Sequence, residues 1–252
     1  MEDHVTMLNA PTLEKLHGLK LGAMATAWND QHGQPDVIAL SFDERFGLLV
    51  ESEWRARENK RLTRALQEAK LKIPQACVEA IDYPARRELD KALVRQLATC
   101  RWVEEHQNLL VVGATGTGKT FVGCAFAHQA CRKGFRALYR RASRLFHELT
   151  LARADGTYLR LLTKLARVDV LLIDDWGLDA LGPQDRRDLL ELLDDRHGAR
   201  ATILTSQLPV AQWHDFIGDP TLADSICDRL LHTGHRIVLK GPSRRKEGKL
   251  DS

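Results

Sequence analysis

Apolar positions near the start of the chain recur at the spacing of a helix, at Leu13, Leu16, Leu19, Leu21 and Met24. Gly18 and Gly22 argue against one continuous helix there, and residues 30–36 are typical of a turn. A second helix is predicted to begin after Ser41, whose side chain can cap it while Glu44 returns the hydrogen bond, and to extend towards Pro74. We therefore expect a small all-helical N-terminal domain over residues 1–75.

The pattern changes after residue 75. Residues 76–108 predict a linker followed by a helix over 86–100. Short, continuously apolar runs then alternate with helical segments. Strands are predicted over 109–112, 137–139, 168–173 and 201–205, and helices over 119–132, over 144–154 with Ser143 as cap, and again before residue 168. Strands that are apolar throughout and alternate with helices indicate a parallel sheet covered on both faces, so the predicted class is α/β, with a second domain over 76–252.

Composition excludes several classes of protein. The chain is 44% hydrophobic and 28% charged, as soluble globular proteins are, and no apolar run approaches the roughly 18 residues of a membrane span. The N-terminus carries acids and lacks the apolar core of a signal peptide, so we expect a cytoplasmic location. The five cysteines form no C-x-x-C pair and fit no zinc pattern. A net charge of +3 excludes a histone-like chain but leaves DNA binding open.

The clearest chemical signal is a glycine-rich loop between the predicted strand 109–112 and the helix that follows it. It reads G-x-x-x-x-G-K-[ST], so its backbone N–H groups can surround phosphate oxygens while Lys119 reaches the β- and γ-phosphates and Thr120 ligates Mg²⁺. The alternative, a strand-to-helix turn with a surface lysine, is much weaker in this context. The residues predicted to bind ATP are Gly113, Ala114, Thr115, Gly116, Thr117, Gly118, Lys119, Thr120 and Phe121.

Two further strands end in polar residues. The run 168–173 leads into Asp174 and Asp175, and at the carboxyl end of a parallel strand such acids face the ligand crevice. We expect Asp174 to hold Mg²⁺ and Asp175 to orient and polarise the attacking water. The strand 201–205 leads into Ser206 and Gln207, either of which could position that water. Each strand end read alone could be an ordinary turn.

These three strand ends, in this order, resemble the Walker A, Walker B and sensor 1 motifs of AAA+ ATPases. The segments GATGTGKT, VLLIDDWG, ILTSQLP, CDRLLH and KGPSRR, with LKLGAMATAW and SFDERFGLLVESEWRAR near the N-terminus, resemble the IstB-like helper proteins of insertion sequences. Those proteins are relatives of the DnaC helicase loaders and the DnaA initiator. The resemblance extends from about Leu13 to Arg245. It implies an AAA+ P-loop domain preceded by a small helical domain.

The resemblance also implies roles for two arginines. Arg229 matches the arginine finger that reaches the ATP of a neighbouring subunit, although it could instead form a surface ion pair with Asp228 or Asp224. Arg245 matches the sensor 2 arginine, with Arg244 as an equal donor. In this chain Asp175 stands where many AAA+ proteins have Glu, and Gln207 where Asn is more usual. Both departures favour a role in which ATP binding matters as much as turnover.

Basic residues gather at several places that could contact DNA phosphates. Those predicted to do so are Arg57, Lys60, Arg61 and Arg64 in the second helix, and Arg136, Arg140, Arg141 and Arg144 after the P-loop helix. In the second helix the alternative is a solvated face in which the arginines pair with glutamates. No residue is a convincing reader of base edges, so we expect sequence-independent binding. Trp176, next to the acids, is a further candidate for a partner contact.

The favoured function is an ATP-dependent DNA-binding regulator of transposition. By resemblance, it would bind ATP and Mg²⁺, assemble as a homo-oligomer through ATP interfaces on duplex DNA, and recruit or activate a transposase. A DnaC-type helicase loader would share every ATPase residue. A P-loop kinase would need neither Arg229 nor DNA, and a pure ATP-gated scaffold would need no hydrolysis.

Overall fold

The structure is a computed structural model that describes residues 2–83, 87–232 and 234–243. The chain divides into two compact units, Met1–Arg64 and Ala65–Ser252, and the point of division along the sequence falls inside a helix. The sequence places the division later, after residue 75, and that domain boundary stays a prediction.

The first unit is helical, with α1 (Glu2–Gly18), α2 (Gly22–Gln31), α3 (Pro35–Ile38) and most of α4 (Phe42–Ala69). The predicted interruption between Gly18 and Gly22 is present. The predicted capping box is also present, since Ser41 N donates to Glu44 Oε2 at 2.9 Å and Glu44 N donates to Ser41 Oγ at 3.4 Å. Glu53 joins α4 to α2 because its carboxylate accepts bonds from Ala23 N and Met24 N, 3.0 and 3.1 Å away.

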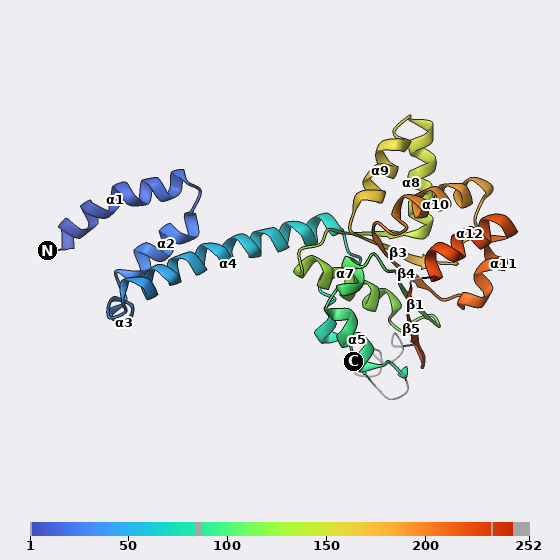
Figure 1. The fold of residues 1–252 in the computed structure, drawn as a ribbon, viewed down its shortest axis with the longest axis horizontal. Coiled ribbons are helices and arrows are strands. Elements are labelled where there is room, and N and C mark those ends of the chain that lie inside the picture. Colours follow the sequence, from blue (N-terminus) through green and yellow to red (C-terminus); the bar gives the residue numbers. More distant parts are fainter. Residues whose placement is uncertain (1, 84–86, 233, 244–252) are drawn as a thin grey trace, which may run out of the picture. The chain divides into compact units, whose positions relative to one another are not determined.

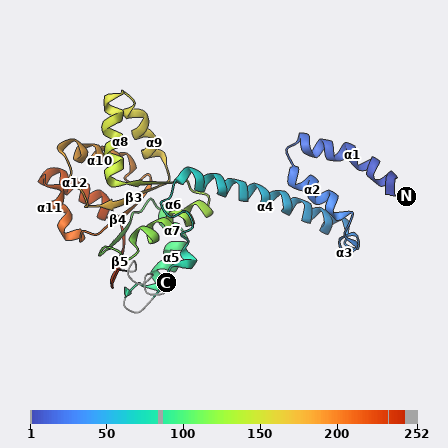
Figure 2. The same ribbon diagram turned by 180° about the vertical axis from the view of Figure 1, so that it is seen from behind.

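The second unit is built on one parallel sheet (Figures 1 and 2). The strand order is β2-β3-β4-β1-β5. The strands are β1 (Leu109–Gly113), β2 (Ala137–Arg141), β3 (Val170–Trp176), β4 (Ala201–Ser206) and β5 (His235–Leu239). The predicted α/β class is therefore confirmed. The edge strand β5 has no counterpart among the predicted strands, because only Ile237 and Leu239 of its five residues are buried and no continuous apolar run marks it.

Helices lie on both sides of the sheet, with α7 on one side and α10 to α12 on the other (Figures 1 and 2). They are α5 (Lys91–Ala98), α6 (Arg101–Glu104), α7 (Lys119–Arg132), α8 (Ala142–Ala154), α9 (Tyr158–Arg167), α10 (Pro183–Arg196), α11 (Trp213–Ile217) and α12 (Pro220–Leu231), with short 3₁₀ turns at Val78–Ala80 and Val210–Gln212. Central strands are buried almost throughout. This packing holds the carboxyl ends of β1, β3 and β4 side by side.

Two helix predictions need correction. The helix predicted over 86–100 is shorter, because Asp90 caps α5 by accepting from Ala92 N at 2.7 Å, and Cys100 takes a left-handed φ of 64° after it. The predicted cap Ser143 lies inside α8, which begins one residue earlier at Ala142.

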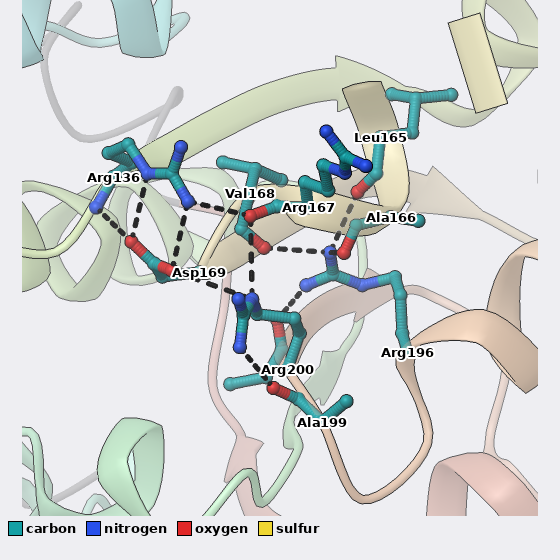
Figure 3. Close-up of polar contacts among 10 residues, drawn as sticks. Arg136, Leu165, Ala166, Arg167, Val168, Asp169, Arg196, Ala199 and Arg200 are labelled. Atoms are coloured by element: carbon teal, nitrogen blue, oxygen red, sulfur yellow. Dashed lines mark hydrogen bonds and ion pairs between the residues drawn. The ribbon is translucent and has the colours of Figure 1, made fainter. Parts of the chain in front are cut away.

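A buried arginine ties the amino-terminal edge of the sheet together (Figure 3). Arg196, at the end of α10, is 1% exposed and donates to the carbonyls of Leu165 and Val168 at 2.7 and 2.9 Å. It also donates to Thr202 Oγ1 at 3.1 Å and to the Ala201 carbonyl. Burial lowers the pKa of Arg196 to about 9, so it stays charged at neutral pH.

Replacing this arginine is expected to destabilise the second unit. Arg196→Met leaves several buried carbonyls without donors, each costing roughly 1–3 kcal/mol, so we expect the free energy of unfolding to fall by about 3 kcal/mol or more. Urea denaturation measures this loss. Arg200→Met is the control, because Arg200 is half-exposed and forms an ion pair with Asp169 in the same cluster. Such an exposed pair contributes about 1 kcal/mol or less to the free energy of unfolding. Equal losses in the two variants would contradict the structural role of Arg196.

Candidate nucleotide site

The glycine-rich loop joins β1 to α7 at the carboxyl edge of the sheet. Gly116 and Gly118 have φ of +83° and +92°, a region that glycine enters without strain. Lys119 is 8% exposed, and its ammonium donates to the Ala114 carbonyl at 2.9 Å. Thr117 Oγ1 bonds to the same carbonyl at 2.8 Å. The loop is thus curled over its own backbone at the start of a helix, the arrangement that binds phosphate.

Gly116 is needed for space as well as for conformation. A Cβ atom at this position would lie 2.0 Å from Ser243 Oγ, whereas one at Gly156, with φ +77°, would meet nothing within 4 Å. We expect Gly116→Ala to weaken ATP binding at least ~10-fold, because roughly 1.4 kcal/mol of displacement strain is enough for that change. Fluorescence titration with a labelled nucleotide measures it. Gly156→Ala carries the backbone strain alone, so a similar loss there would refute the steric explanation.

Asp174 is the centre of a buried hydroxyl cluster. Its side chain is completely buried at the end of β3, and one oxygen accepts from Thr205 Oγ1 at 2.5 Å and from Thr120 Oγ1 at 2.9 Å. Its other oxygen accepts from Tyr139 on β2 at 2.9 Å. Burial, and then the charge of Asp174, raise the pKa of the Tyr139 phenol, which keeps it a donor. The carboxylate is therefore held in one orientation beside the P-loop threonine.

Asp175 lies beside this cluster but is more accessible. Its backbone takes a φ of +61°, and its N–H donates to Thr205 Oγ1 at 3.2 Å. Its carboxylate forms an ion pair with Arg141 at 3.0 Å and lies 3.9 Å from the Lys72 ammonium. The left-handed turn therefore directs the second acid away from the buried cluster, towards two cations.

Ser206 is the last residue of β4 and Gln207 follows it, and of these two residues only Gln207 lines the nucleotide pocket. Ser206 is completely buried and donates to the Trp176 carbonyl at 2.7 Å. Gln207 Oε1 accepts from Thr115 Oγ1 in the P-loop at 2.6 Å. Gln207 therefore remains the candidate for positioning water.

A cavity of about 480 Å³ joins these groups. It is bordered by Arg141, Asp175 and Gln207, with Ile73 and Leu178 as apolar walls, and by the P-loop residues Thr115, Gly116, Gly118, Lys119, Thr120 and Phe121. Its volume and mixed lining are those of a small-molecule site. Among the residues that the structure describes, no cluster of three or more His, Cys, Asp or Glu could hold a metal by itself. The hydroxyl of Thr120 and the carboxylate of Asp174 are the hard oxygen donors that suit Mg²⁺ shared with a nucleotide, so the residues fit this ion.

Arg229 lies near the amino-terminal ends of the strands, whereas the P-loop follows the carboxyl end of β1. Its carbonyl accepts a bond from Asn108 Nδ2 at 2.8 Å, and Asn108 directly precedes β1, whose far end is Gly113. The five residues of β1 span roughly 13 Å, and this length separates Arg229 from the P-loop of its own subunit. The Arg229 side chain therefore does not point to a phosphate bound there. It pairs with Asp194 on α10, not with Asp224 or Asp228. A contact between Arg229 and a second subunit's nucleotide stays a prediction, beside the alternative of a structural ion pair with Asp194.

The predicted sensor arginine, Arg245, lies outside the described residues, as does Arg244. The preceding chain does reach the P-loop, because Leu239 closes against Gly113 and Ser243 against Gly116.

Within the second unit, the predicted DNA-contacting residues do not form one surface. Arg136 lies at the start of β2, where it pairs with Asp169 at 3.2 Å (Figure 3), whereas Arg140, Arg141 and Arg144 lie at the other end of that strand. In α4, Arg57 pairs with Glu53 and Arg61 with Glu58. These pairs match the solvated-face alternative; a DNA contact by Arg57, Lys60, Arg61 or Arg64 stays a prediction.

Several site residues escaped the sequence analysis. Tyr139, Lys72 and Thr205 touch the acids, and Arg87 donates from its guanidinium to the P-loop carbonyl of Thr117 at 3.0 Å. Thr205 could have been found from the sequence, because it is the last residue of the predicted strand 201–205 and directly precedes Ser206. Trp176, the candidate for a partner contact, is completely buried against Trp213 and Phe216.

Comparison with known proteins identifies relatives of this chain. The model of the family described as IstB-like ATP binding protein matches residues 14–252. An insertion sequence ATP-binding protein of Sinorhizobium fredii is 48% identical over 240 residues, which cover 95% of this chain and 98% of that protein. The ATP-binding protein of insertion sequence IS1162 from Pseudomonas fluorescens is 51% identical over 203 residues, 81% of this chain and 88% of that protein.

Solved structures agree in fold. The DnaC helicase loader matches with a TM-score of 0.55 at 19% identity, over 66% of this chain and 97% of that one. The replication initiator DnaA, bound to AMPPCP and single-stranded DNA, matches with a TM-score of 0.56 at 18% identity, over 72% of this chain and 56% of that one. These likenesses show an AAA+ fold. The family match over residues 14–252 and the insertion-sequence relatives establish that the chain belongs to the IstB-like ATP-binding proteins of insertion sequences.

Proposed function

We propose that this protein is an ATP-dependent DNA-binding regulator of transposition, which hydrolyses ATP, assembles on duplex target DNA, and recruits or activates a transposase. The observation that carries the ATPase part is the buried carboxylate of Asp174, held beside the P-loop by Thr120 and Thr205. The insertion-sequence relatives support the link to transposition.

The residues divide the chemistry of hydrolysis among them. The P-loop N–H groups and Lys119 hold the phosphates, and Thr120 with Asp174 would hold Mg²⁺, which when bound neutralises charge on the β- and γ-phosphates. Asp175 accepts a proton from the attacking water, which Gln207 orients. Arg229 of a neighbouring subunit stabilises charge on the γ-phosphate, so the ATP site is complete only in a homo-oligomer.

DNA contact is best supported at the end of β2 and the start of α8. Arg140, Arg141 and Arg144 line one cavity there, and cations gathered at one place neutralise phosphates.

Among the described residues no helix is both long and apolar enough to cross a membrane. We propose that the protein acts on DNA in the cytoplasm.

The alternative of a DnaC-type helicase loader shares this site and fold. It differs in the partner, so capture of the cognate transposase or of a replicative helicase by the purified protein separates the two. A P-loop kinase would need neither Arg229 nor DNA, and the match to ATP-binding proteins of insertion sequences gives it no support.

ATP hydrolysis with and without duplex DNA tests the proposal. We expect hydrolysis that duplex DNA stimulates, and that Lys119→Ala reduces to background because the phosphates lose their cation. Lys133→Ala is the matched control, since it removes an exposed lysine at the other end of α7. Hydrolysis indifferent to DNA would count against the proposed assembly, and hydrolysis that survives Lys119→Ala would count against the site.

A further inference from the structure

A second cavity adjoins the nucleotide site and is lined mainly by cations. It has a volume of about 680 Å³ and lies between the end of β2, the start of α8 and the segment that follows α4. We call it the basic pocket. Its cations are Lys70, Lys72, Arg140, Arg141 and Arg144, and its lining includes one acid, Glu148. An excess of positive charge in a concave surface favours a phosphate group.

Two of these cations belong to the nucleotide site as well. The Lys72 ammonium lies 3.5 Å from Asp174 Oδ2 and 3.9 Å from Asp175 Oδ2, so it bridges the two acids. Arg141 Nε lies 3.0 Å from Asp175 Oδ2. Arg140, in contrast, is held within the pocket by Glu148 at 2.9 Å. The ion pairs of Lys72 and Arg141 with the two acids therefore lie where the basic pocket and the nucleotide site adjoin.

The Lys72 ammonium lies where the positive charge of a bound metal ion is expected, beside the Asp174 carboxylate. Asp174 is the predicted Mg²⁺ ligand; the two oxygens of its carboxylate accept three hydroxyl donors, and Lys72 lies within ion-pair distance of it. An ammonium and a divalent ion within a few ångströms of one carboxylate repel each other strongly. The Lys72 side chain is 46% exposed, and its long flexible stem can turn into the basic pocket.

We propose that the Lys72 ammonium takes the place of the metal ion beside Asp174 and Asp175. A phosphodiester of duplex DNA that binds in the basic pocket attracts Lys72 away from these acids. Binding of DNA and binding of the metal–nucleotide therefore strengthen each other. This proposal rests on the proposed function, since it takes DNA as the occupant of the basic pocket. Because the coupling is an equilibrium property, it is reciprocal: DNA tightens metal binding by the same factor by which the metal–nucleotide tightens DNA binding.

Metal titrations test the stand-in role without reference to activity. Free Mn²⁺ is measured by electron paramagnetic resonance while MnCl₂ is added to the full-length protein with the non-hydrolysable analogue AMPPNP. Without DNA, Lys72→Met is expected to bind Mn²⁺ about 10-fold more tightly than the wild type, within the range of ordinary coupling effects. Lys70→Met is the matched control, because Lys70 lines the same pocket and forms no ion pair with either acid among the described contacts.

The same titration with a 30-base-pair duplex tests the coupling. We expect the duplex to tighten Mn²⁺ binding to the wild type and to Lys70→Met about 5-fold or more, and to leave Lys72→Met unchanged. Fluorescence anisotropy of the labelled duplex, with and without Mn²⁺, measures the reciprocal effect. Circular dichroism melting confirms that each variant is folded.

The outcomes separate the two proposals. Equal Mn²⁺ affinity in the wild type and Lys72→Met, or an equal gain in Lys70→Met, would overturn the stand-in role. A wild type that binds the duplex without any change in Mn²⁺ affinity would overturn the coupling alone. A wild type that does not bind the duplex would sink the proposed function and the coupling, while the titrations without DNA still decide what Lys72 does.

Discussion

Asparagine at position 174 is expected to lower Mg²⁺-dependent ATP hydrolysis about 100-fold or more. The carboxylate is the negative charge that would hold the metal beside Thr120, and an amide of the same shape cannot replace it. Metal-assisted charge stabilisation contributes several kcal/mol to such reactions, and about 1.4 kcal/mol corresponds to each tenfold change in rate. Steady-state phosphate release at saturating ATP measures the effect.

Asp174→Asn should also separate metal binding from nucleotide binding. Lys119 and the loop remain, so we expect ATP affinity in the presence of EDTA to change little. The substituted amide meets the Thr120, Thr205 and Tyr139 hydroxyls, which can reverse their donor and acceptor roles, so the loss of stability should stay near 1–3 kcal/mol. Asp179→Asn removes an exposed carboxylate from the loop that follows β3 and serves as the control. Hydrolysis within tenfold of the wild type would place the metal on another group.

Much of this site could be read from the sequence because local patterns specify it. The P-loop depends on the order of glycines between one strand and one helix, and the acids follow a run of buried residues. Parallel strands between helices then bring Gly113, Asp174 and Gln207 to one edge, whatever the strand order. The choice between Ser206 and Gln207 needed the structure, since Ser206 is buried against the Trp176 carbonyl at the end of β4, whereas Gln207, after the strand, contacts the P-loop.

The missing parts depend on contacts that no local pattern encodes. Tyr139 reaches Asp174 only because β2 lies next to β3, with Arg141 opposite Asp174 in register. Lys72 follows the end of α4 in an irregular segment, and its meeting with the acids is a tertiary event. Strand β5 is an edge strand with exposed positions, and its sequence lacks the continuous apolar run that marked the other four. Sequence periodicity reports burial, and it reports neither strand order nor the partner of a charged side chain.

Arg229→Ala is expected to reduce ATP hydrolysis about 1000-fold, because an arginine finger contributes on the order of 10³ or more to the rate. Since Arg229 lies at the sheet edge opposite its own P-loop, the defect should leave ATP binding by that subunit intact. Arg229→Lys should not restore the rate, since a lysine lacks the planar pair of donors. Arg236→Ala, which removes an exposed arginine from β5, is the control.

Mixing variants distinguishes a finger supplied by a neighbour from one that acts within its own subunit. Arg229→Ala keeps a complete nucleotide site but has no finger, whereas Asp174→Asn keeps the finger but has a defective site. In a mixed assembly the finger of an Asp174→Asn subunit meets the intact site of an Arg229→Ala neighbour, so we expect the mixture to hydrolyse ATP well above the sum of the two variants alone. If Arg229 acted in its own subunit, every subunit of the mixture would remain defective and no activity would return. That outcome would contradict a finger supplied by a neighbour, and the subunit interface would have to be sought on another surface.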